Sequence, residues 1–358
     1  MNISEIDKSS IRAAIIGPGK ATTRTWDKGG GHKIGYDHAA AINEQPGAFV
    51  VTAADIDLTN LTAFQKEFSV SGGHLDYREM LDADRPDLVA ICTYMGLHSR
   101  MILDSIAAGV RCIVCEKPFV ASPSELVAVQ KAVEESGCKL ALAHIRRFAP
   151  CFLKAKELIQ SNTIGDPVIF VGGLEGWDLS EFGSHWIDLI RLMMDDQPVI
   201  SVFGQARVRD GRGYGHAMED HAMVSFEFEK GCRGYVEGGR GLVPGGTTDI
   251  RVIGTEGLLS ITEHKHVEVW NKEGYQKYET PTECNLFEQF YATVVDWLRG
   301  GEESIASFRH CYQTSEINLA AYVSAMNSDR IDLPFSDDIA RIDKFPVENL
   351  AEKVRKNS

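Results

Sequence analysis

The first 145 residues alternate short, strongly apolar runs with segments of helical periodicity, and this rhythm constrains the fold more than any other feature of the chain. Each apolar run is too hydrophobic to leave one side in water, so we expect strands that are buried on both faces. The expected strands are residues 11–16, 49–54, 88–91, 111–115 and 139–143. The expected helices between them are residues 35–43, 58–68, 98–108 and 123–136. Such alternation predicts βαβ units and a parallel sheet with helices on both faces.

Two of these helices carry their own boundary signals. Asp57 is placed to cap the helix that follows it. Ser122 and Glu125 form a capping box with Pro123 at the first helical position, and Gly137 is placed to end that helix.

After about residue 150 the pattern changes to a period of two. Residues 222–229 alternate apolar and polar side chains, which is typical of a strand with one buried face in an antiparallel sheet. Further expected strands are residues 168–171, 199–208, 233–237, 250–254, 258–261 and 267–270, and expected helices are residues 184–194, 286–299 and 309–326. We therefore predict a doubly wound α/β domain over residues 1–148 and an α+β domain with a large, mainly antiparallel sheet over residues 149–358.

Charge and cysteine content narrow the class of protein. The formal net charge is −14 at pH 7, which disfavours binding to nucleic acid or to anionic lipid. The first ten residues are polar and the first apolar run is short, so we expect neither a signal peptide nor a membrane span. Cys112 and Cys115 form a C-x-x-C within an expected strand, where side chains three residues apart face opposite sides. We expect buried thiols in a reducing, cytoplasmic environment rather than a redox or zinc pair.

Gly17, Pro18 and Gly19 directly follow the first expected strand. In a Rossmann turn the first glycine permits a tight bend, and the second lets the backbone approach a pyrophosphate at a helix N-terminus. The third glycine normally follows three residues later and is absent there. We interpret Gly35 as this third glycine, displaced by an insertion. The insertion, Ala21–Lys33, is either a lid that closes over bound ligand or a surface loop without a role in binding.

Asp55 stands at the end of the second expected strand, about twenty residues beyond the glycines once the insertion is subtracted. A carboxylate at this place accepts hydrogen bonds from the adenosine ribose and repels a 2′-phosphate. The next residues, Ile56 and Asp57, include no arginine for such a phosphate. We therefore expect NAD rather than NADP, with Ile56 beside the cofactor. The alternative is that Asp55 only caps the following turn.

Polar residues follow the next two central strands, at the edge of an open α/β sheet where ligands bind. Thr93 and His98 follow one strand, and Glu116 and Lys117 follow the other, so we expect all four beside the cofactor. A lysine in this position can donate to a substrate oxygen and polarise a carbonyl group. A cis bond at Pro118 would fix the direction of the lysine.

The order of these elements resembles the Gfo/Idh/MocA family of glucose–fructose oxidoreductases and inositol dehydrogenases. The elements are the strand with its G-x-G turn, Asp55, Thr93 to His98, Glu116-Lys117-Pro118, and His144-Ile145-Arg146-Arg147-Phe148-Ala149-Pro150. The resemblance covers nearly the whole chain, and Glu-Lys-Pro after an apolar strand is its most specific part. It implies a two-domain fold whose open second sheet makes oligomer contacts, and hence a homodimer or homotetramer.

In that family a lysine, an aspartate and a histidine share proton transfer, the last two as D-x-x-x-H. The resemblance assigns Lys117 and His185 to the lysine and the histidine, and it places Glu181 where the aspartate would stand. Asp178 is the other candidate carboxylate, on the substrate side. We expect His185 to titrate near neutrality and to take the hydroxyl proton, while Asp188 orients His185 or caps its helix.

Other polar side chains are candidates for the same cleft. His144 and Arg146 are placed to bind substrate, with an interdomain hydrogen bond as the alternative for His144 and a surface salt bridge expected for the neighbouring Arg147. His216 and His221 flank an acidic pair in an expected loop. Their spacing matches no metal site that we recognise, so we expect no metal.

Together these features predict an NAD-dependent dehydrogenase that oxidises a secondary hydroxyl of a sugar, sugar derivative or cyclitol. Lys117 would stabilise the developing charge on oxygen, and His185 would accept the proton. Two alternatives stay open: a glycosidase that uses tightly held NAD for a transient oxidation, and a non-catalytic sensor of dinucleotide or sugar.

Overall fold

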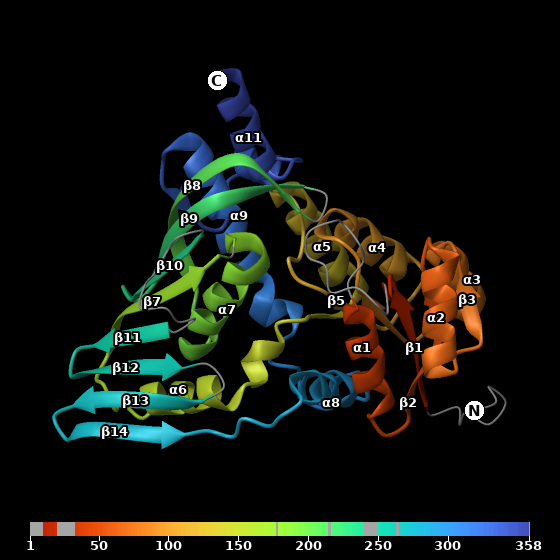
Figure 1. The fold of residues 1–358 in the computed structure, drawn as a ribbon, viewed down its shortest axis with the longest axis horizontal. Helices are drawn as coiled ribbons and strands as arrows, with labels where there is room; N and C mark the ends of the chain where they lie inside the picture. Colours follow the sequence, from red (N-terminus) through yellow and green to blue (C-terminus); the bar gives the residue numbers. More distant parts are fainter. Residues whose placement is uncertain are drawn as a thin grey trace.

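A computed structural model describes residues 10–19, 33–176, 178–213, 216–239, 250–262 and 265–357. Its strands form two separate sheets, with helices between and around them (Figure 1). The insertion predicted at Ala21–Lys33 lies outside these residues apart from Lys33, so its role stays a hypothesis.

The first sheet has six parallel strands in the order β3-β2-β1-β4-β5-β6. The strands are β1 (Ile11–Ile16), β2 (Ala48–Ala54), β3 (Gly72–His74), β4 (Leu88–Ile91), β5 (Cys112–Cys115) and β6 (Lys139–Leu142). The central strands β4 and β5 are buried along their whole length, as an uninterrupted apolar sequence requires in a sheet covered on both faces. The chain reverses its direction of travel across the sheet between β1 and β4, which is where such sheets bind ligands.

Five helices connect these strands: α1 (Ile34–Asn43), α2 (Leu58–Phe68), α3 (Tyr77–Asp84), α4 (Met95–Ala107) and α5 (Pro123–Ser136). The predicted caps are confirmed. The Asp57 carboxylate accepts the amide of Thr59 at 2.8 Å, and the Ser122 hydroxyl accepts the amide of Glu125 at 3.3 Å. Gly137 ends α5 with φ of 68°. These ends are defined by local hydrogen bonds, which is why the sequence marks them.

The second sheet has nine strands in the order β14-β13-β12-β11-β7-β10-β9-β8-β15. Its neighbours are antiparallel except β7 and β10. The strands are β7 (Pro167–Glu175), β8 (Val199–Gly213), β9 (His216–Phe228), β10 (Arg233–Gly239), β11 (Ile250–Gly254), β12 (Gly257–Thr262), β13 (His266–Asn271), β14 (Gly274–Glu279) and β15 (Ile331–Asp332). The predicted period of two is confirmed in β9, where Ala222, Val224 and Phe226 are buried and the residues between them are partly exposed.

Helices cover the side of this sheet that faces the first sheet (Figure 1). The helical elements of this part are η2 (Ile145–Phe148), α6 (Pro150–Gln160), η3 (Leu179–Gly183), α7 (Ser184–Met193), α8 (Leu286–Leu298), α9 (Phe308–Asn327), α10 (Asp337–Ala340) and α11 (Pro346–Asn357). α6 packs on β12 and β13, α7 on β10, and α9 on β8 and β9. Among the described residues, no helix packs on the opposite face. α8 packs instead on α1, a helix of the first sheet, and this contact connects the two parts of the fold.

Several elements differ from the sequence-based predictions. β3 and α3 were not predicted, because a three-residue strand and a polar helix leave no apolar periodicity. α4 begins at Met95 rather than at His98. His216 and His221 lie in β9 and not in a loop, because this strand begins before its apolar alternation starts. The predicted domain boundary at residue 148 falls at the end of η2, between the two sheets, and stays a prediction.

The two thiols of the C-x-x-C motif lie in β5, where Cys112 and Cys115 are free and fully buried. Burial raises the pKa of both thiols, so both are protonated and unreactive. The expectation of buried thiols is confirmed. In the part of the chain that the structure describes, no helix is long and apolar enough to cross a membrane.

Candidate active site

The glycine turn after β1 has the shape that close approach of a dinucleotide requires. Gly17 and Gly19 have φ of 73° and 79°, a region that favours glycine. A Cβ atom on Gly17 would lie 2.5 Å from Cγ2 of Thr93, and one on Gly35 would lie 2.5 Å from Cα of Pro18. Gly35 therefore allows the N-terminal turn of α1 to pack against the loop, which is the packing role of the third glycine in such a turn.

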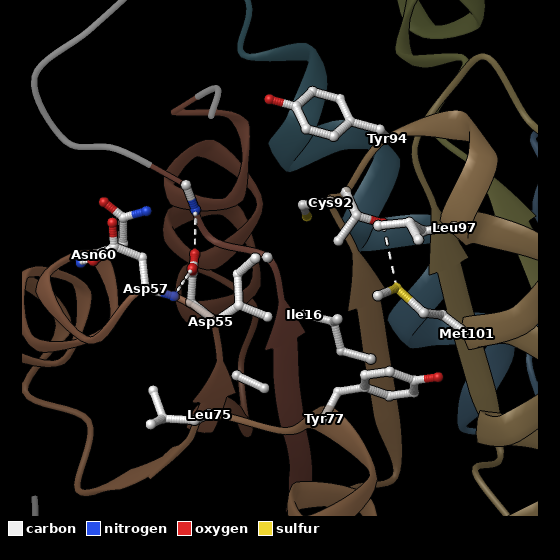
Figure 2. Close-up of a pocket in the computed structure, with 15 residues that line it drawn as sticks. Ile16, Asp55, Asp57, Asn60, Leu75, Tyr77, Cys92, Tyr94, Leu97 and Met101 are labelled. Atoms are coloured by element: carbon white, nitrogen blue, oxygen red, sulfur yellow. Dashed lines mark hydrogen bonds between the residues drawn. The ribbon is translucent and has the colours of Figure 1, made fainter. Parts of the chain in front are cut away.

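Asp55 lies at the end of β2 and faces the glycine turn (Figure 2). Its Oδ2 accepts the amide of Gly19 at 3.3 Å, and its Oδ1 accepts the amide of Asp57 at 2.8 Å. The carboxylate thus caps the following turn, which was the alternative interpretation of Asp55. It also lines the adjoining cavity, so the two roles are compatible.

A cavity of about 340 Å³ lies between the glycine turn, the end of β2 and the start of α4 (Figure 2). Its walls are mostly apolar, and three of its aliphatic side chains are unusually exposed: Ile56 at 94%, Leu75 at 53% and Leu97 at 47%. Exposed aliphatic groups beside a carboxylate that can accept hydrogen bonds suit the flat faces of an adenine ring. The shape, the glycines and Asp55 therefore fit the adenosine half of NAD.

A second cavity of about 220 Å³ adjoins the first, and the two share Cys92, Thr93 and Tyr94. It is lined by the residues expected to react, together with apolar side chains. The polar lining residues from the prediction are Thr93, Glu116, Lys117, Arg146, Glu181 and His185. The structure therefore brings these six together next to the dinucleotide cavity, although they come from the ends of strands in the first sheet and from η2, η3 and α7.

Lys117 follows β5 and is joined to Pro118 by a cis peptide bond, as the sequence suggested. Its Nζ donates to the backbone oxygen of Glu181 at 3.2 Å and lies 3.5 Å from Oε2 of the same residue. The lysine side chain is 20% exposed, so its ammonium group is held at the cavity wall and remains accessible to a small ligand.

A buried network holds the backbone of this lysine. Oε2 of Glu116 accepts the amide of Lys117 at 3.0 Å, and Oε1 lies 2.9 Å from Nε2 of His38 in α1. Nδ1 of His38 lies 2.6 Å from the hydroxyl of Tyr291 in α8. Burial opposes the charge of Glu116, but the hydrogen bond and charge of His38, with the charge of Lys117, bring its pKa below the ordinary value. Sequence reasoning missed His38 and Tyr291, and the only available signal was the position of His38 three residues after Gly35.

Of the two candidate carboxylates, Glu181 lines the second cavity, which we call the reaction cavity. Asp178 instead caps η3: its Oδ1 accepts the amide of Glu181 at 2.6 Å and the hydroxyl of Ser180 at 3.0 Å. Burial raises the pKa of Glu181 to about 7; Lys117 opposes the rise and the negative charge of Asp178 adds to it. Glu181 can therefore gain or lose a proton near neutral pH.

His185 lies in the first turn of α7, and its side chain is almost fully buried. Burial lowers the pKa of His185 well below its usual value, and the positive charges of Arg146 and Lys117 lower it further. The expectation that it titrates near neutrality is therefore wrong, because desolvation and two cations both penalise the imidazolium. Its ring is edge-on to His144 at 5.7 Å, and burial lowers the pKa of that histidine as well.

Asp188 does not orient His185. Its carboxylate accepts two hydrogen bonds of 2.8 Å from Arg147, and its nearest histidine atom is Nδ1 of His144, 3.9 Å away. Arg147 also binds Asp196 at 2.8 and 3.0 Å and is fully buried. The predicted surface salt bridge of Arg147 is thus wrong, because this guanidinium lies in the interior between η2 and α7.

Arg146 and His98 lie in different surroundings. The guanidinium of Arg146 stacks on Phe182 and Trp186 at 5.1 and 5.3 Å and lines the reaction cavity, and burial lowers its pKa to about 10. His98 is fully buried and lines neither cavity. Its ring nitrogens lie 3.0 Å from the backbone oxygen of Thr93 and 2.9 Å from that of Phe119. It therefore holds the cavity wall in place rather than facing the cofactor site.

Comparison with known proteins identifies both halves of the chain. A family model described as "Oxidoreductase family, NAD-binding Rossmann fold" matches residues 29–144, and one described as "GFO/IDH/MocA C-terminal domain" matches residues 152–260. The chain is 27% identical to scyllo-inositol 2-dehydrogenase (NAD(+)) of Bacillus subtilis over 92% of its length and 97% of the relative. It is 26% identical to D-apiose dehydrogenase of Paraburkholderia graminis, over 87% of this chain and 92% of that protein.

A solved structure shares the fold. The oxidoreductase from Agrobacterium radiobacter, crystallised with NAD+, L-tartaric acid and magnesium, superposes with a TM-score of 0.76. It is 19% identical in sequence, and the match covers 90% of this chain and 98% of that one.

Proposed function

This chain belongs to the Gfo/Idh/MocA family of NAD-binding oxidoreductases, and from that premise we propose that it oxidises a secondary hydroxyl group of a cyclitol or sugar with NAD. The observation that carries the proposal is the convergence of Lys117, Glu181 and His185 in a cavity next to the one that the glycine turn lines. The names of the inositol and apiose dehydrogenases among its relatives support the substrate class.

Gly17, Gly19 and Gly35 would admit the pyrophosphate, and Asp55 would bind the ribose. Bound NAD supplies the acceptor for the electron pair that leaves the carbinol carbon. We infer NAD rather than NADP because the carboxylate of Asp55 would repel a 2′-phosphate.

The residues of this chain handle the hydroxyl oxygen and its proton. Lys117 donates a hydrogen bond to the oxygen and stabilises charge as the carbonyl forms. His185 is neutral at pH 7, so a ring nitrogen can accept a hydrogen bond from the hydroxyl, but its depressed pKa makes it a poor final holder of the proton. Glu181, with its pKa near 7, is better matched to that step.

The test is the initial rate of NADH and NADPH formation with a panel of inositols, polyols and aldoses, in wild type and Lys117→Ala. Acid–base and electrostatic help of this kind is worth on the order of 10²- to 10⁴-fold, so the variant should lose most of its turnover. It should still bind NADH, measured by fluorescence. Lys131→Ala, an exposed lysine on α5, is the matched control.

Full activity in Lys117→Ala would overturn the assignment of this residue. Wild type that binds NADH tightly but releases none with any substrate, while it cleaves a glycoside, would favour the glycosidase. Tight binding without any turnover would favour the sensor.

We also infer that the chain assembles through the open face of its second sheet. Four large apolar side chains on strands of this sheet are 37–54% exposed: Phe203, Ile253, Trp270 and Tyr275. Apolar groups spread over β8, β11, β13 and β14 suit a protein interface, and the resemblance to the family points to a homodimer or homotetramer.

A further inference from the structure

The carboxyl group of Glu181 lies between two nitrogen atoms from different parts of the fold. Its Oε2 is 3.5 Å from Nζ of Lys117, which follows β5, and its Oε1 is 3.9 Å from Nε2 of His216 at the start of β9. The side chains of Glu181 and His216 are 13% and 11% exposed. Sequence analysis set His216 aside as a loop residue, and nothing in its local sequence links it to Glu181.

The hydrogen bonds of His216 define which of its nitrogens carries hydrogen. Nδ1 lies 2.9 Å from the backbone oxygen of Ala217, and a carbonyl oxygen only accepts hydrogen bonds. Nδ1 must therefore be the donor, which leaves Nε2 of the neutral ring as an acceptor. Nε2 is buried and has no hydrogen-bond partner within the described ranges. It needs a donor, and the Glu181 carboxyl group facing it can be one only when it is protonated.

Two contacts hold His216 in this position. The ring of Phe345, just before α11, packs edge-on against the imidazole with the centroids 5.0 Å apart. Oε1 of Glu348 in α11 accepts the amide of Ala217 at 2.7 Å. The start of β9 is thus fixed from one side by α11 while Nε2 faces Glu181 from the other.

The charged groups around Glu181 act in opposite directions. Its burial favours the neutral carboxyl group, and the negative charges of Asp178 in its own turn and of Glu116 after β5 do the same. Lys117 favours the carboxylate. Glu348 is the carboxylate on the α11 side of His216, and it is engaged with the amide of Ala217. The balance allows Glu181 to hold a proton at neutral pH and to give it up to a suitable acceptor.

We propose that Glu181 and His216 form a proton-holding pair that receives the proton released by the substrate hydroxyl. The inference rests on the proposed dehydrogenase function. The hydroxyl O–H bond breaks and its proton passes to Lys117 as the lysine gives one of its own protons to the Glu181 carboxylate, so the lysine is unchanged. A rotation of the Glu181 side chain that shortens the 3.9 Å separation by about 1 Å then lets its O–H donate to Nε2 of His216. When the proton crosses, His216 becomes an imidazolium and Glu181 a carboxylate again; no electrons move between them.

The length of the glutamate is part of this arrangement. An aspartate at position 181 would withdraw the carboxyl group by about 1.5 Å, the length of one C–C bond. The separation of 3.9 Å between Oε1 and Nε2 of His216 is already longer than a hydrogen bond, and that change would lengthen it further. The residue that departs from the aspartate of the family is therefore the one whose carboxyl group lies close enough for a side-chain rotation to bring it to this histidine. His216 acts through Glu181 and is a positioning residue rather than one that touches substrate.

The first test needs neither cofactor nor substrate. Infrared difference spectra of the purified protein between pH 6 and pH 8 should show the C=O stretch of a protonated carboxylic acid that disappears near pH 7. Burial raises the pKa of Glu219 to about 7 as well, so Glu181→Gln should remove one component of this signal and leave that of Glu219. Glu181→Asp should move the frequency of the Glu181 component because the acid lies further from its acceptor. His221→Gln, on the same strand, is the matched control and should leave the band unchanged. Absence of any band that Glu181→Gln removes would overturn the proposal even in an active enzyme.

The second test is the pH dependence of kcat for substrate oxidation. His216→Gln keeps a carbonyl that can accept from Glu181 but cannot take the proton. We expect it to lower kcat at least tenfold with little change in KM and to shift the pH at which kcat is half-maximal. A wild-type rate and pH profile in His216→Gln would overturn the proton-holding role. If the infrared band behaves as expected but wild type oxidises no substrate, the proposed dehydrogenase function fails while the pair stands.

Discussion

Replacing Arg147 with methionine should destabilise the fold by about 3–5 kcal/mol, which is the usual cost of removing one partner from a buried ion pair. The guanidinium is fully buried and makes five hydrogen bonds of 2.8–3.0 Å, two to Asp188, two to Asp196 and one to the backbone oxygen of Ile305. Methionine fills a similar volume but leaves the carboxylate of Asp188 in the interior without its cation, while Asp196 keeps Arg191 at 3.7 Å and His310 at 2.8 Å. The free energy of unfolding of an ordinary domain is about 5–15 kcal/mol, so this loss is a large share of the total stability.

The destabilisation should depend on pH with a defined sign. Burial opposes the charge of Asp188 and Asp196, but Arg147 contributes to bringing the pKa of both carboxyl groups below the usual value. The wild-type contribution is therefore present above about pH 4, the unfolded value, and is lost only as the pH falls further. Without Arg147, burial raises the pKa of Asp188 above its unfolded value. The variant then recovers stability as the pH falls from 7.5 to 5.5.

The assay is urea unfolding of wild type and Arg147→Met at pH 7.5 and pH 5.5. The slope of the unfolding free energy against urea concentration is compared between them to detect a change in the unfolded state. Arg330→Met is the matched control, because its ion pair with Asp332 is mostly exposed and should contribute less than about 1 kcal/mol. Adding Asp188→Asn to Arg147→Met should recover part of the loss, since it removes one unpaired charge. A loss below about 1 kcal/mol at pH 7.5, or one that grows at pH 5.5, would refute the reasoning.

Two further predictions concern the cofactor and the assembly. Asp55→Asn should weaken NADH binding by about ten- to a hundredfold, because hydrogen bonds to a charged group are worth about 1.5–3 kcal/mol, and it should weaken NADPH binding less. Fluorescence titration of both nucleotides measures the two affinities. An unchanged ratio between them would contradict the prediction. The double variant Ile253→Asp, Trp270→Asp should have a lower molecular mass of the oligomer in light scattering than wild type. The control Val127→Asp on α5 should leave this mass unchanged. An unchanged mass in the double variant would count against the open sheet face as the interface.

The elements that sequence reasoning predicted best are those defined by neighbours along the chain. The apolar runs of β1, β4 and β5 indicate burial on both faces, and the caps of α2 and α5 need only residues within one turn. Gly35 could be placed because its role depends on a short stretch after β1. By contrast, β3 and α3 have too few apolar residues to produce a pattern.

The chemistry of the site was less predictable, because it depends on residues that are distant in sequence. His185 was expected to titrate near neutrality, yet Arg146 and Lys117 approach it from η2 and from the end of β5. The choice between Asp178 and Glu181 depended on which carboxylate the first turn of η3 would engage. His216 is brought to Glu181 by the register of β9, which shifts against β8 near Val208 and which no local pattern reports.

The hydrogen-bonded chain of Tyr291, His38 and Glu116 has a consequence for how such proteins can be recombined. The three side chains come from α8, α1 and the end of β5, and together they determine where the backbone of Lys117 sits. A chimera that takes its first 140 residues from a distant relative would inherit two members of this chain without the third. Positions 38, 116 and 291 should therefore be exchanged as one unit when the nucleotide-binding half is transplanted between family members.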